Sequence, residues 1–310
     1  MITYGLGTYT IQALDKWNNP ETPKASINIP IEISEEEHKN LLDAISKVGS
    51  VFRYTAIFSA TIWNYDDLAT TVNSYLQAFI QKDSKFLGNR NITLNINKEV
   101  LNVLTSFRFY LDFIDENLHK DFGKDSGIVE NFGSDCSTEY DNNFSYRLIY
   151  HLRNFAQHKG LVISSVKFSK FLDEERANTV RQHLTISVNR NDIIEDKKFK
   201  KEIKAELTNY PEAIDIIDHL LKWISSLTRI HNQLIQRIIP TRLNNALFII
   251  EQVRKLDYNK DDNQVIPILS IIDHSKDNIK DVINPSFVPL PIEDAQRIIE
   301  YCKEHNLTAK

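Results

Sequence analysis

Apolar residues recur at helical spacing through most of the chain, and they alternate at strand spacing only in short stretches. The clearest helix covers residues 143–160, because Asn143 is a good N-cap and Gly160 stands where helices often end in a left-handed residue. At about 100° per residue, its apolar residues fall on one broad arc. They are Phe144, Leu148, Ile149, Leu152, Phe155 and Ala156. The pattern predicts a helix that packs through one face.

The first half of the chain contains signals for three further helices. Ser34 and Glu37 form a capping box for a short helix that ends near residue 48, and a second helix begins near residue 66. Residues 51–63 between them fit either a strand or a buried helix. A long helix is predicted to begin at Asn97. Its apolar seam has the spacing of a helix that packs beside another, and consists of Leu104, Phe107, Leu111, Ile114 and Leu118.

The second half predicts a long helix that begins at Pro211 and keeps heptad spacing to Ile238, where Pro240 should kink or end it. His231 falls within its apolar seam and is interpreted as a hydrogen-bonded core residue. Further helices are predicted at 198–207, 243–256 and 291–304. Residues 122–142, rich in Gly, Ser, Asp and Asn, are predicted to form a long loop, and residues 285–291 a linker.

Two regions alternate at strand spacing. Ile27, Ile29, Ile31 and Ile33 predict a half-buried strand, and Pro30 places it at the edge of a sheet. Residues 161–168 and 180–188 predict a hairpin directly after the helix at 143–160. We therefore expect a mainly α protein, with this small hairpin and a short β-containing N-terminal region. The predicted domains are an N-terminal accessory region (1–95), a helical domain (96–256) and a C-terminal extension with a terminal helix (257–310).

Composition and charge are those of an ordinary globular protein. The 310 residues are 42% hydrophobic and 25% charged, with a formal net charge of −5, which argues against a surface built for non-specific nucleic-acid binding. The charge is uneven, however. No Asp or Glu occurs between residues 142 and 172, where Arg147, Arg153, Lys159, Lys167 and Lys170 lie. This segment is compatible with a local site for one RNA segment, and also with a neutral surface of uneven charge.

The polar arc of the helix at 143–160 carries the candidate chemistry. Most solvent-facing helices carry Lys and Glu there, but this arc has no acidic residue. It consists of Tyr146, Arg147, Tyr150, His151, Arg153, Asn154, Gln157 and His158. Arginine presents a planar fork that matches phosphate oxygens, and histidine exchanges protons near neutral pH. The arc therefore predicts a surface that meets a phosphate.

Arg153, Asn154 and His158 form an R-x4-H motif with a polar residue directly after the arginine. The motif ends a helix that follows a long amphipathic helix, and over residues 97–160 the chain resembles the HEPN superfamily. The resemblance implies a HEPN-like helical bundle and a metal-independent endoribonuclease, of the kind found in bacterial toxin, abortive-infection and CRISPR systems. It also implies catalytic roles for Arg153, Asn154 and His158, and a function in antiphage defence.

RNA is cleaved without a metal when its 2′-hydroxyl attacks the adjacent phosphodiester. His158 would move protons, Arg153 would stabilise the charge on the phosphate, and Asn154 would orient the imidazole or the phosphate. On an ideal helix, however, Arg153 and His158 point about 140° apart. A two-fold homodimer that places two such helices face to face would solve this, as the HEPN resemblance also implies. We therefore predict a composite site.

Further substrate contacts are assigned to Arg147, Tyr150, His151, Gln157 and Lys159. For Tyr150 the alternative is a half-buried interface aromatic, and for His151 a solvent or interface histidine. Arg108 and Asp112, four residues apart on the long helix, are expected to form a surface ion pair. Two other functions remain open: a non-catalytic HEPN module that binds RNA, a nucleotide or a partner protein, and a dimerisation module whose polar arc is an interface.

Other chemistries have little support in the sequence. The eight glycines form no phosphate-binding loop, and Cys136 and Cys302 match neither a zinc site nor a disulfide framework. We expect no metal and no other cofactor. No signal pattern or membrane-length apolar run occurs, so a cytoplasmic protein that does not enter the membrane is expected. The expected partners are RNA, a second copy of the chain, and an antitoxin or sensor protein.

Overall fold

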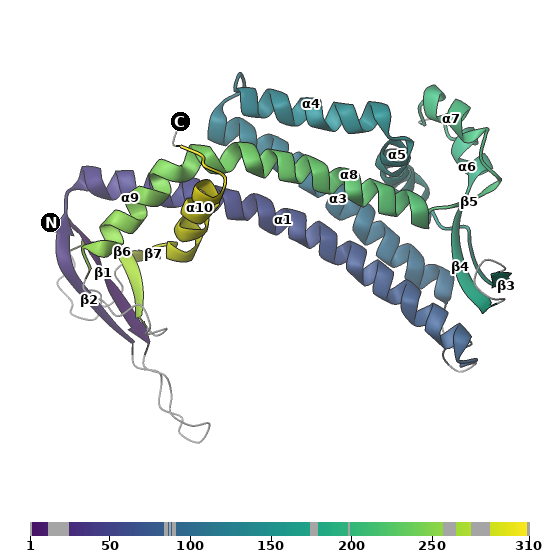
Figure 1. Ribbon diagram of the computed structural model, residues 1–310, viewed down its shortest axis with the longest axis horizontal. Coiled ribbons are helices and arrows are strands. Elements are labelled where there is room, and N and C mark those ends of the chain that lie inside the picture. The colour runs from purple at the N-terminus through teal and green to yellow at the C-terminus, as the bar shows by residue number, and fades with distance from the viewer. Residues whose placement is uncertain are drawn as a thin grey trace. The chain divides into compact units, whose positions relative to one another are not determined.

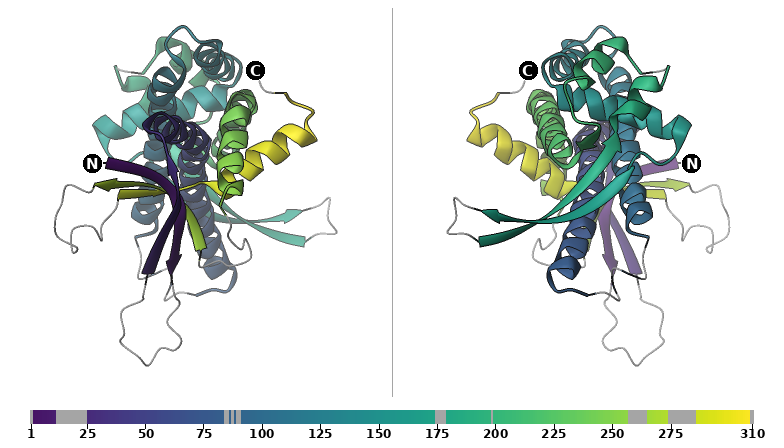
Figure 2. Two further views of the ribbon diagram at one scale, coloured as in Figure 1. Left: turned by 90° about the vertical axis from the view of Figure 1, so that its left-hand side faces the viewer. Right: turned by 90° about the vertical axis from the view of Figure 1, so that its right-hand side faces the viewer.

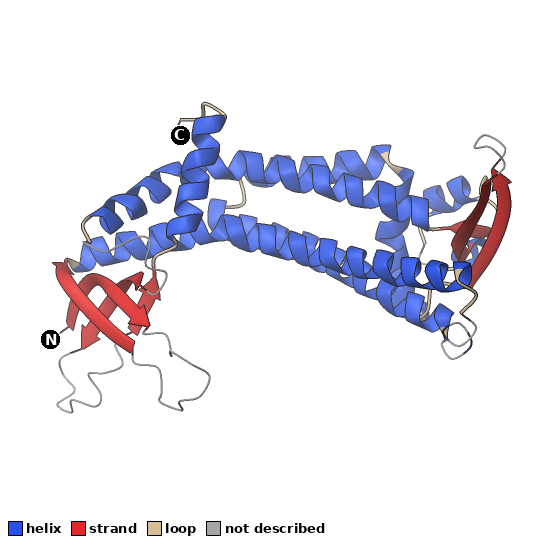
Figure 3. Cartoon of the chain, turned by 60° about the horizontal axis from the view of Figure 1, so that its bottom comes forward, coloured by secondary structure: helices blue, strands red, loops and turns tan. Residues whose placement is uncertain are grey.

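The computed structural model describes residues 2–11, 25–83, 86, 88, 91–173, 179–197, 199–256, 265–273 and 286–308. Most of these residues are helical, and the strands form two small antiparallel sheets (Figures 1 and 3). The predicted mainly α fold with small β elements is therefore confirmed. The chain divides into two compact units: Met1–Arg53 with Ile235–Lys310, and Tyr54–Leu234.

The first unit contains a four-stranded sheet built from both ends of the chain (Figure 2, left). Its order is β2-β1-β6-β7, with β1 at Ile2–Ile11, β2 at Ala25–Ile33, β6 at Val265–Asp273 and β7 at Ser286–Pro289. Strand β2 lies at the edge, and its isoleucines are half-buried between exposed neighbours, as predicted. At Gly7, a Cβ atom would lie 2.1 Å from the Asn28 carbonyl oxygen, so the close approach of β1 and β2 requires glycine there.

Several helix boundaries lie where the sequence predicts. The capping box is present: the Glu37 N–H donates to Ser34 Oγ at 3.1 Å, and the Ser34 N–H donates to Glu37 Oε2 at 2.9 Å. Helix α8 (Ile217–Ile238) ends just before Pro240, which lies in the 3-10 helix η1 (Ile239–Arg242). Helices α9 (Leu243–Arg254) and α10 (Ile292–Glu304) follow and pack on each other.

The second unit is a bundle made of α1 (Glu35–Ile80) from residue 54 onwards, α3 (Ile92–Phe122), α4 (Gly127–Asn142), α5 (Phe144–Lys159) and α8 (Figure 1). The predicted seam of α3 is buried along its whole length. His231 is a core residue, as predicted. Its ring stacks on Phe58 at 4.0 Å between centroids, and its Nδ1 lies 3.2 Å from the Tyr110 hydroxyl.

The predicted hairpin after α5 is confirmed (Figure 2, right). Strands β3 (Ser165–Asp173) and β4 (Thr179–Asn189) pair antiparallel, and the short β5 (Ala213–Asp215) adds a third strand beside β4. Two short helices, α6 (Arg190–Glu195) and α7 (Lys201–Leu207), lie between β4 and β5 in the chain. Phe168 of β3 stacks on Phe79 of α1 at 4.7 Å between ring centroids, which joins the sheet to the bundle.

Several predicted boundaries are wrong. Helix α1 runs unbroken over Glu35–Ile80, because the apolar run at 51–63 is helical and the stretch has no proline and only one glycine, Gly49. The predicted loop at 122–142 is mostly helix α4: Phe132, Cys136 and Tyr140 recur every four residues and give this polar stretch a packing face. Helix α8 begins at Ile217, after β5, and the predicted linker at 285–291 contains β7.

Helix α3 begins before the predicted N-cap. Asn91 caps it, and Asn97 is fully buried inside the helix. The compact units also divide the chain at different points from the predicted domains 1–95, 96–256 and 257–310, because β1 near the start of the chain pairs with β6 near its end. Among the described helices, none combines the length and apolar character of a membrane-spanning helix.

Candidate functional site

Helix α5 is fixed at both ends by the caps that the sequence predicts. The Asn143 side-chain oxygen accepts hydrogen bonds from the N–H groups of Ser145 at 3.0 Å and Tyr146 at 3.4 Å. Gly160 has a φ of +87°, and its N–H donates to the Ala156 carbonyl at 2.8 Å. Only glycine adopts this conformation freely, so the helix ends at Lys159, one residue after His158.

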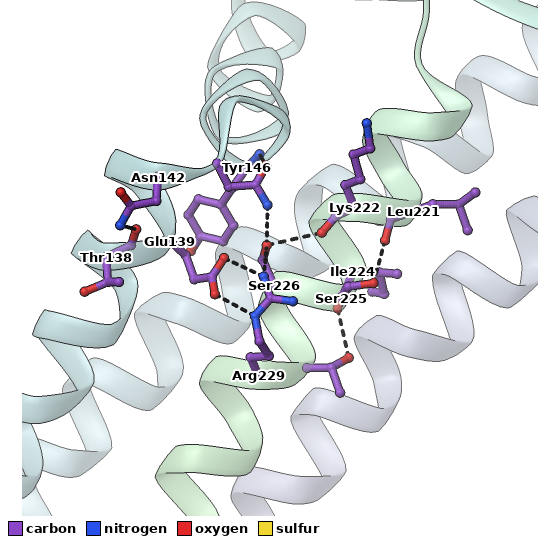
Figure 4. A network of polar contacts seen from close by, with 12 residues as sticks. Thr138, Glu139, Asn142, Tyr146, Leu221, Lys222, Ile224, Ser225, Ser226 and Arg229 are labelled. Carbon is purple, nitrogen blue, oxygen red and sulfur yellow. Dashed lines mark hydrogen bonds and ion pairs between the residues drawn. The ribbon is translucent and has the colours of Figure 1, made fainter.

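A polar network attaches the start of α5 to α8 (Figure 4). The Asn143 amide donates to Ser226 Oγ at 2.7 Å, and Arg229 donates to the same oxygen at 3.0 Å. Arg229 also forms a two-point ion pair with Glu139 near the end of α4, with both contacts at 2.8 Å. The position of α5 therefore depends on side chains of both neighbouring helices.

The predicted polar arc is not one exposed surface. Its N-terminal half is internal: Tyr146 is 1% exposed, His151 is 6% exposed and Tyr150 is half-buried. Its C-terminal half is open, because Asn154, Gln157, His158 and Lys159 are exposed. Helices α3 and α4 and the segment before α7 cover the first half, and only the tertiary structure reveals this cover.

Arg147 was predicted as a substrate contact, but it is half-buried and bonded to neighbouring elements. One guanidinium nitrogen donates to the carbonyl oxygens of Tyr140 and Asp141, both at 2.6 Å, and another pairs with the Glu206 carboxylate at 2.8 and 2.9 Å. Through these bonds Arg147 of α5 joins the end of α4 to α7. Its partner Glu206 lies 59 residues along the chain, which is why the local pattern gave no sign of it.

His151 also belongs to the interior, neither to solvent nor to an interface between chains. Its Nε2 lies 2.8 Å from the Tyr140 hydroxyl, and its ring packs near Phe199 at 5.5 Å. Burial lowers the pKa of His151 to about 4, and the positive charge of Lys200 acts in the same direction. The imidazole is therefore neutral at pH 7.

Tyr150 contacts the cation of the neighbouring helix. The predicted Arg108–Asp112 ion pair is present, with nitrogen–oxygen distances of 2.9 and 2.7 Å. Arg108 donates a further hydrogen bond to the Tyr150 hydroxyl at 2.8 Å. Tyr150 is thus a half-buried aromatic residue that links α3 to α5.

Arg153 has a different environment from the other arginines of this region. Its guanidinium donates to the side-chain oxygens of Gln157 at 2.6 Å and Asn154 at 3.2 Å. Both partners are neutral amides, and no carboxylate of the described residues pairs with it. The cation is therefore held in position while its charge is not compensated, which is the state that favours phosphate binding.

His158 is exposed at the last turn of α5 and makes no hydrogen bond to any described residue. The structure brings Arg153, Asn154 and Gln157 together, but it does not bring His158 to them. Asn154 contacts Arg153 and not His158, so within one chain it does not orient the imidazole.

Lys159 lies beside an acidic hollow at the end of α5. The hollow has a volume of about 460 Å³, and its wall includes Asp192, Glu195 and Asp196. Local spacing does not predict these acids near Lys159, because α6 returns to this point only after the hairpin. Among the described residues, no three His, Cys, Asp or Glu side chains gather as a metal site would require.

A cavity that the sequence did not predict lies where α3, α4 and α5 meet, with a volume of about 460 Å³. Its wall includes Arg108, Phe132, Tyr140, Tyr146, Tyr150 and Lys200. Tyr146 and Tyr150 are spaced by four residues on α5, and Phe132, Cys136 and Tyr140 repeat this spacing on α4. Spacing by four residues places these side chains on one face of each helix, and it was the local sequence signal that could have indicated this cavity.

The chain matches no model of a protein family, no curated protein and no solved structure.

Proposed function

We propose that the chain is a metal-independent endoribonuclease of the HEPN type. The observation that carries the proposal is the state of Arg153: a guanidinium fixed by two amide oxygens, without a carboxylate partner among the described residues, on the same open helix end as the exposed His158. Structural arginines of this region have other partners. Arg147 and Arg229 pair with glutamates, and Arg108 pairs with Asp112.

These groups suit cleavage by the 2′-hydroxyl of RNA. The 2′-oxygen forms a bond to the adjacent phosphorus while the bond to the 5′-oxygen breaks, giving a 2′,3′-cyclic phosphate and a free 5′-hydroxyl. One imidazole takes the proton from the 2′-hydroxyl, and an acid returns a proton to the leaving oxygen. Arg153 binds the phosphate oxygens and stabilises the charge that grows on them.

The proposal includes a homodimer. Arg153 and His158 point about 140° apart on one helix, so a single chain does not aim both at one phosphate. A two-fold axis beside the open end of α5 would bring His158 of a second copy opposite Arg153. From the HEPN resemblance we further propose a growth-arresting role in antiphage defence, with an antitoxin or sensor protein as a partner.

The test is cleavage of a mixed RNA pool by the purified chain in excess EDTA. We expect Arg153→Ala and His158→Ala each to lower the rate by about 100-fold or more, because each removes a group that acts on the transition state. Arg297→Ala within α10 and His305→Ala directly after it are the matched controls, since they remove the same side-chain types from exposed positions elsewhere. Circular dichroism checks that the fold is unchanged.

A second candidate is a HEPN-like module that binds RNA or a partner protein without cleaving it. It is favoured by the absence of any hydrogen bond that orients His158 within the described residues, and by the net charge of −5. RNA that stays intact with wild-type protein, yet binds with an affinity that falls steeply with salt and depends on Arg153, would support this candidate and contradict the nuclease.

A further inference from the structure

The cavity between α3, α4 and α5 has the features of a binding site rather than of a packing defect. Its volume of about 460 Å³ lies within the usual range of small-molecule sites, which is roughly 300–1,000 Å³. Its wall is apolar at Leu111 and Phe132 and polar at the tyrosines of α4 and α5. Aromatic walls with a few placed polar groups are typical of sites that hold a planar ligand.

One polar group of this wall is buried and unpaired. Tyr146 is 1% exposed, and within the described part of the chain its hydroxyl has no hydrogen-bond partner. Tyr140 and Tyr150 differ from it, because their hydroxyls bond to His151 and Arg108 at 2.8 Å each. A buried hydroxyl without a partner is costly, so Tyr146 would favour a ligand that places an acceptor in the cavity.

The charges of the wall indicate which ligand fits. Arg108 is already neutralised by Asp112, whereas the ammonium of Lys200 lies 5.0 Å from the ring centre of Tyr140 and is exposed. Within the described ranges, the one ion-pair contact of Asp115 is a long one with His119, at 3.8 Å, and Asp141 also lines the cavity. With three carboxylates and two cations, the wall disfavours a free phosphate or another small anion.

The cavity therefore offers donors and acceptors to one flat ligand. Lys200 and Tyr146 donate hydrogen bonds, and Asp115 and Asp141 accept them. A nucleobase with an exocyclic amino group, as in guanine, adenine or cytosine, carries ring acceptors for the first pair and an amino donor for the second. Uracil has no amino group and offers the carboxylates only its ring N3–H, which lies between two carbonyl oxygens that would face the same acceptors. Recognition of single-stranded RNA commonly uses such splayed bases beside aromatic side chains.

The cavity also lies close to the motif along α5. Tyr146, Tyr150 and Asn154 are spaced by four residues, so they occupy successive turns of one side of the helix, about 6 Å apart along its axis. A base in the cavity would therefore lie about one helical turn from Asn154, the neighbour of Arg153.

We propose that this cavity holds an amino-bearing nucleobase, through the Tyr146 hydroxyl and the Asp115 carboxylate. As the base-selecting site of the enzyme, it rests on the nuclease function proposed above. As a site for a free nucleotide, it does not. An RNA strand and a free nucleotide both present the same base, so the experiment tests both ligands.

The experiment uses the full chain and two readouts. Calorimetric titration with AMP, GMP, CMP and UMP measures the free nucleotides, and titration with 2′-O-methyl oligonucleotides of single-base composition measures uncleavable RNA. The variants are Tyr146→Phe and Asp115→Asn, with Tyr301→Phe and Asp218→Asn as matched changes outside the cavity. Tyr146→Phe removes only an unpaired hydroxyl, so it should not lower the melting temperature.

The expected result is binding of at least one amino-bearing base, with UMP weakest, and a loss of about 3- to 10-fold in Tyr146→Phe and more in Asp115→Asn, but none in the two controls. Loss confined to oligonucleotides assigns the cavity to the RNA strand, and loss with mononucleotides as well assigns it to free nucleotides too. Unchanged affinities in both cavity variants would overturn the proposal. RNA cleavage by the cavity variants with unchanged base preference would overturn the base site and leave the nuclease function intact. Nucleotide binding in the cavity without RNA cleavage would support the base site and contradict the nuclease function.

Discussion

At the scale of single residues, buried histidines make this fold sensitive to acid, and two of the four in the described residues, His151 and His231, carry the prediction. Burial lowers the pKa of His231 to about 4, between Phe58 and Tyr110, and it does the same for His151 beside Tyr140. Both imidazoles are therefore neutral in the folded protein at pH 7, and each would have to gain its proton inside the structure.

We predict that the free energy of unfolding falls as the pH is lowered from about 6.5 to about 4. In this window the unfolded histidine binds a proton and the folded one does not, so each buried histidine lowers stability by about 1.4 kcal/mol per pH unit. Above pH 6.5 both states are neutral, and the stabilisation is fully present. Urea unfolding at pH 7, 6 and 5 measures the slope.

His231→Gln should reduce this slope by the share of one histidine. Ile230→Val, at the fully buried neighbouring position, is the control, because it should weaken the core by about 1 kcal/mol at every pH and leave the slope unchanged. A slope in His231→Gln equal to that of the wild type would show that this imidazole does not couple folding to pH.

At the scale of elements, one side chain ties the segment after α5 to α3. Asn97 of α3 is fully buried, donates to the Ile163 carbonyl at 3.1 Å and accepts from the Ile163 N–H at 2.8 Å. Val162 and Ile163 are buried there as well. The chain between Gly160 and β3 is therefore held by a side chain that imitates a strand partner, and this fixes where the hairpin starts.

Asn97→Ala should lower the free energy of unfolding by about 2–4 kcal/mol, because it leaves a buried N–H and a buried carbonyl of Ile163 without partners. Urea unfolding at pH 7 measures the change. Asn102→Ala is the control on the same helix, where the side chain is exposed and only bonds to Glu99, and we expect a change within about 0.5 kcal/mol. Equal losses in the two variants would contradict the role assigned to Asn97.

At the scale of the whole molecule, the composite site makes a prediction that a site within one chain does not. If Arg153 of one copy works with His158 of the other, mixing the inactive Arg153→Ala and His158→Ala proteins restores activity. Half of the randomly mixed dimers contain both variants, and each of these has one intact site of two, so about a quarter of the wild-type rate is expected. The rate is measured after joint unfolding and refolding.

Light scattering on the wild-type chain measures its molecular mass in solution and shows whether it is a dimer. A dimer whose mixed variants stay inactive would place the complete site within a single chain, and a monomer would remove the composite site altogether. Mixing Arg153→Ala with Arg297→Ala is the control, because about half of the wild-type rate is expected with or without subunit exchange, which measures simple dilution by an inactive variant.

Local sequence chemistry determined the elements whose signals are short-range. Asn143 and Gly160 cap α5, Ser34 and Glu37 form their capping box, and the seam of α3 is buried. Each of these depends on backbone conformation and on residues a few positions away, which the periodicity of the chain records. The exposed end of α5 with Arg153 and His158 was also visible from the sequence, because polar residues at helical spacing define a face.

Only the tertiary structure decided which polar residues of that face are free. Arg147 pairs with Glu206 and His151 with Tyr140, so both lie inside, whereas Arg153 keeps its charge uncompensated among the described residues. Helix α4, read as a loop, becomes a wall because its spaced apolar side chains find partners on α5. Strand β1 pairs with β6 more than two hundred residues later. One physical reason applies to the Arg147 and His151 pairs, to helix α4 and to the pairing of β1 with β6. The free energy of these contacts comes from partners on other elements, and local spacing does not predict which elements meet.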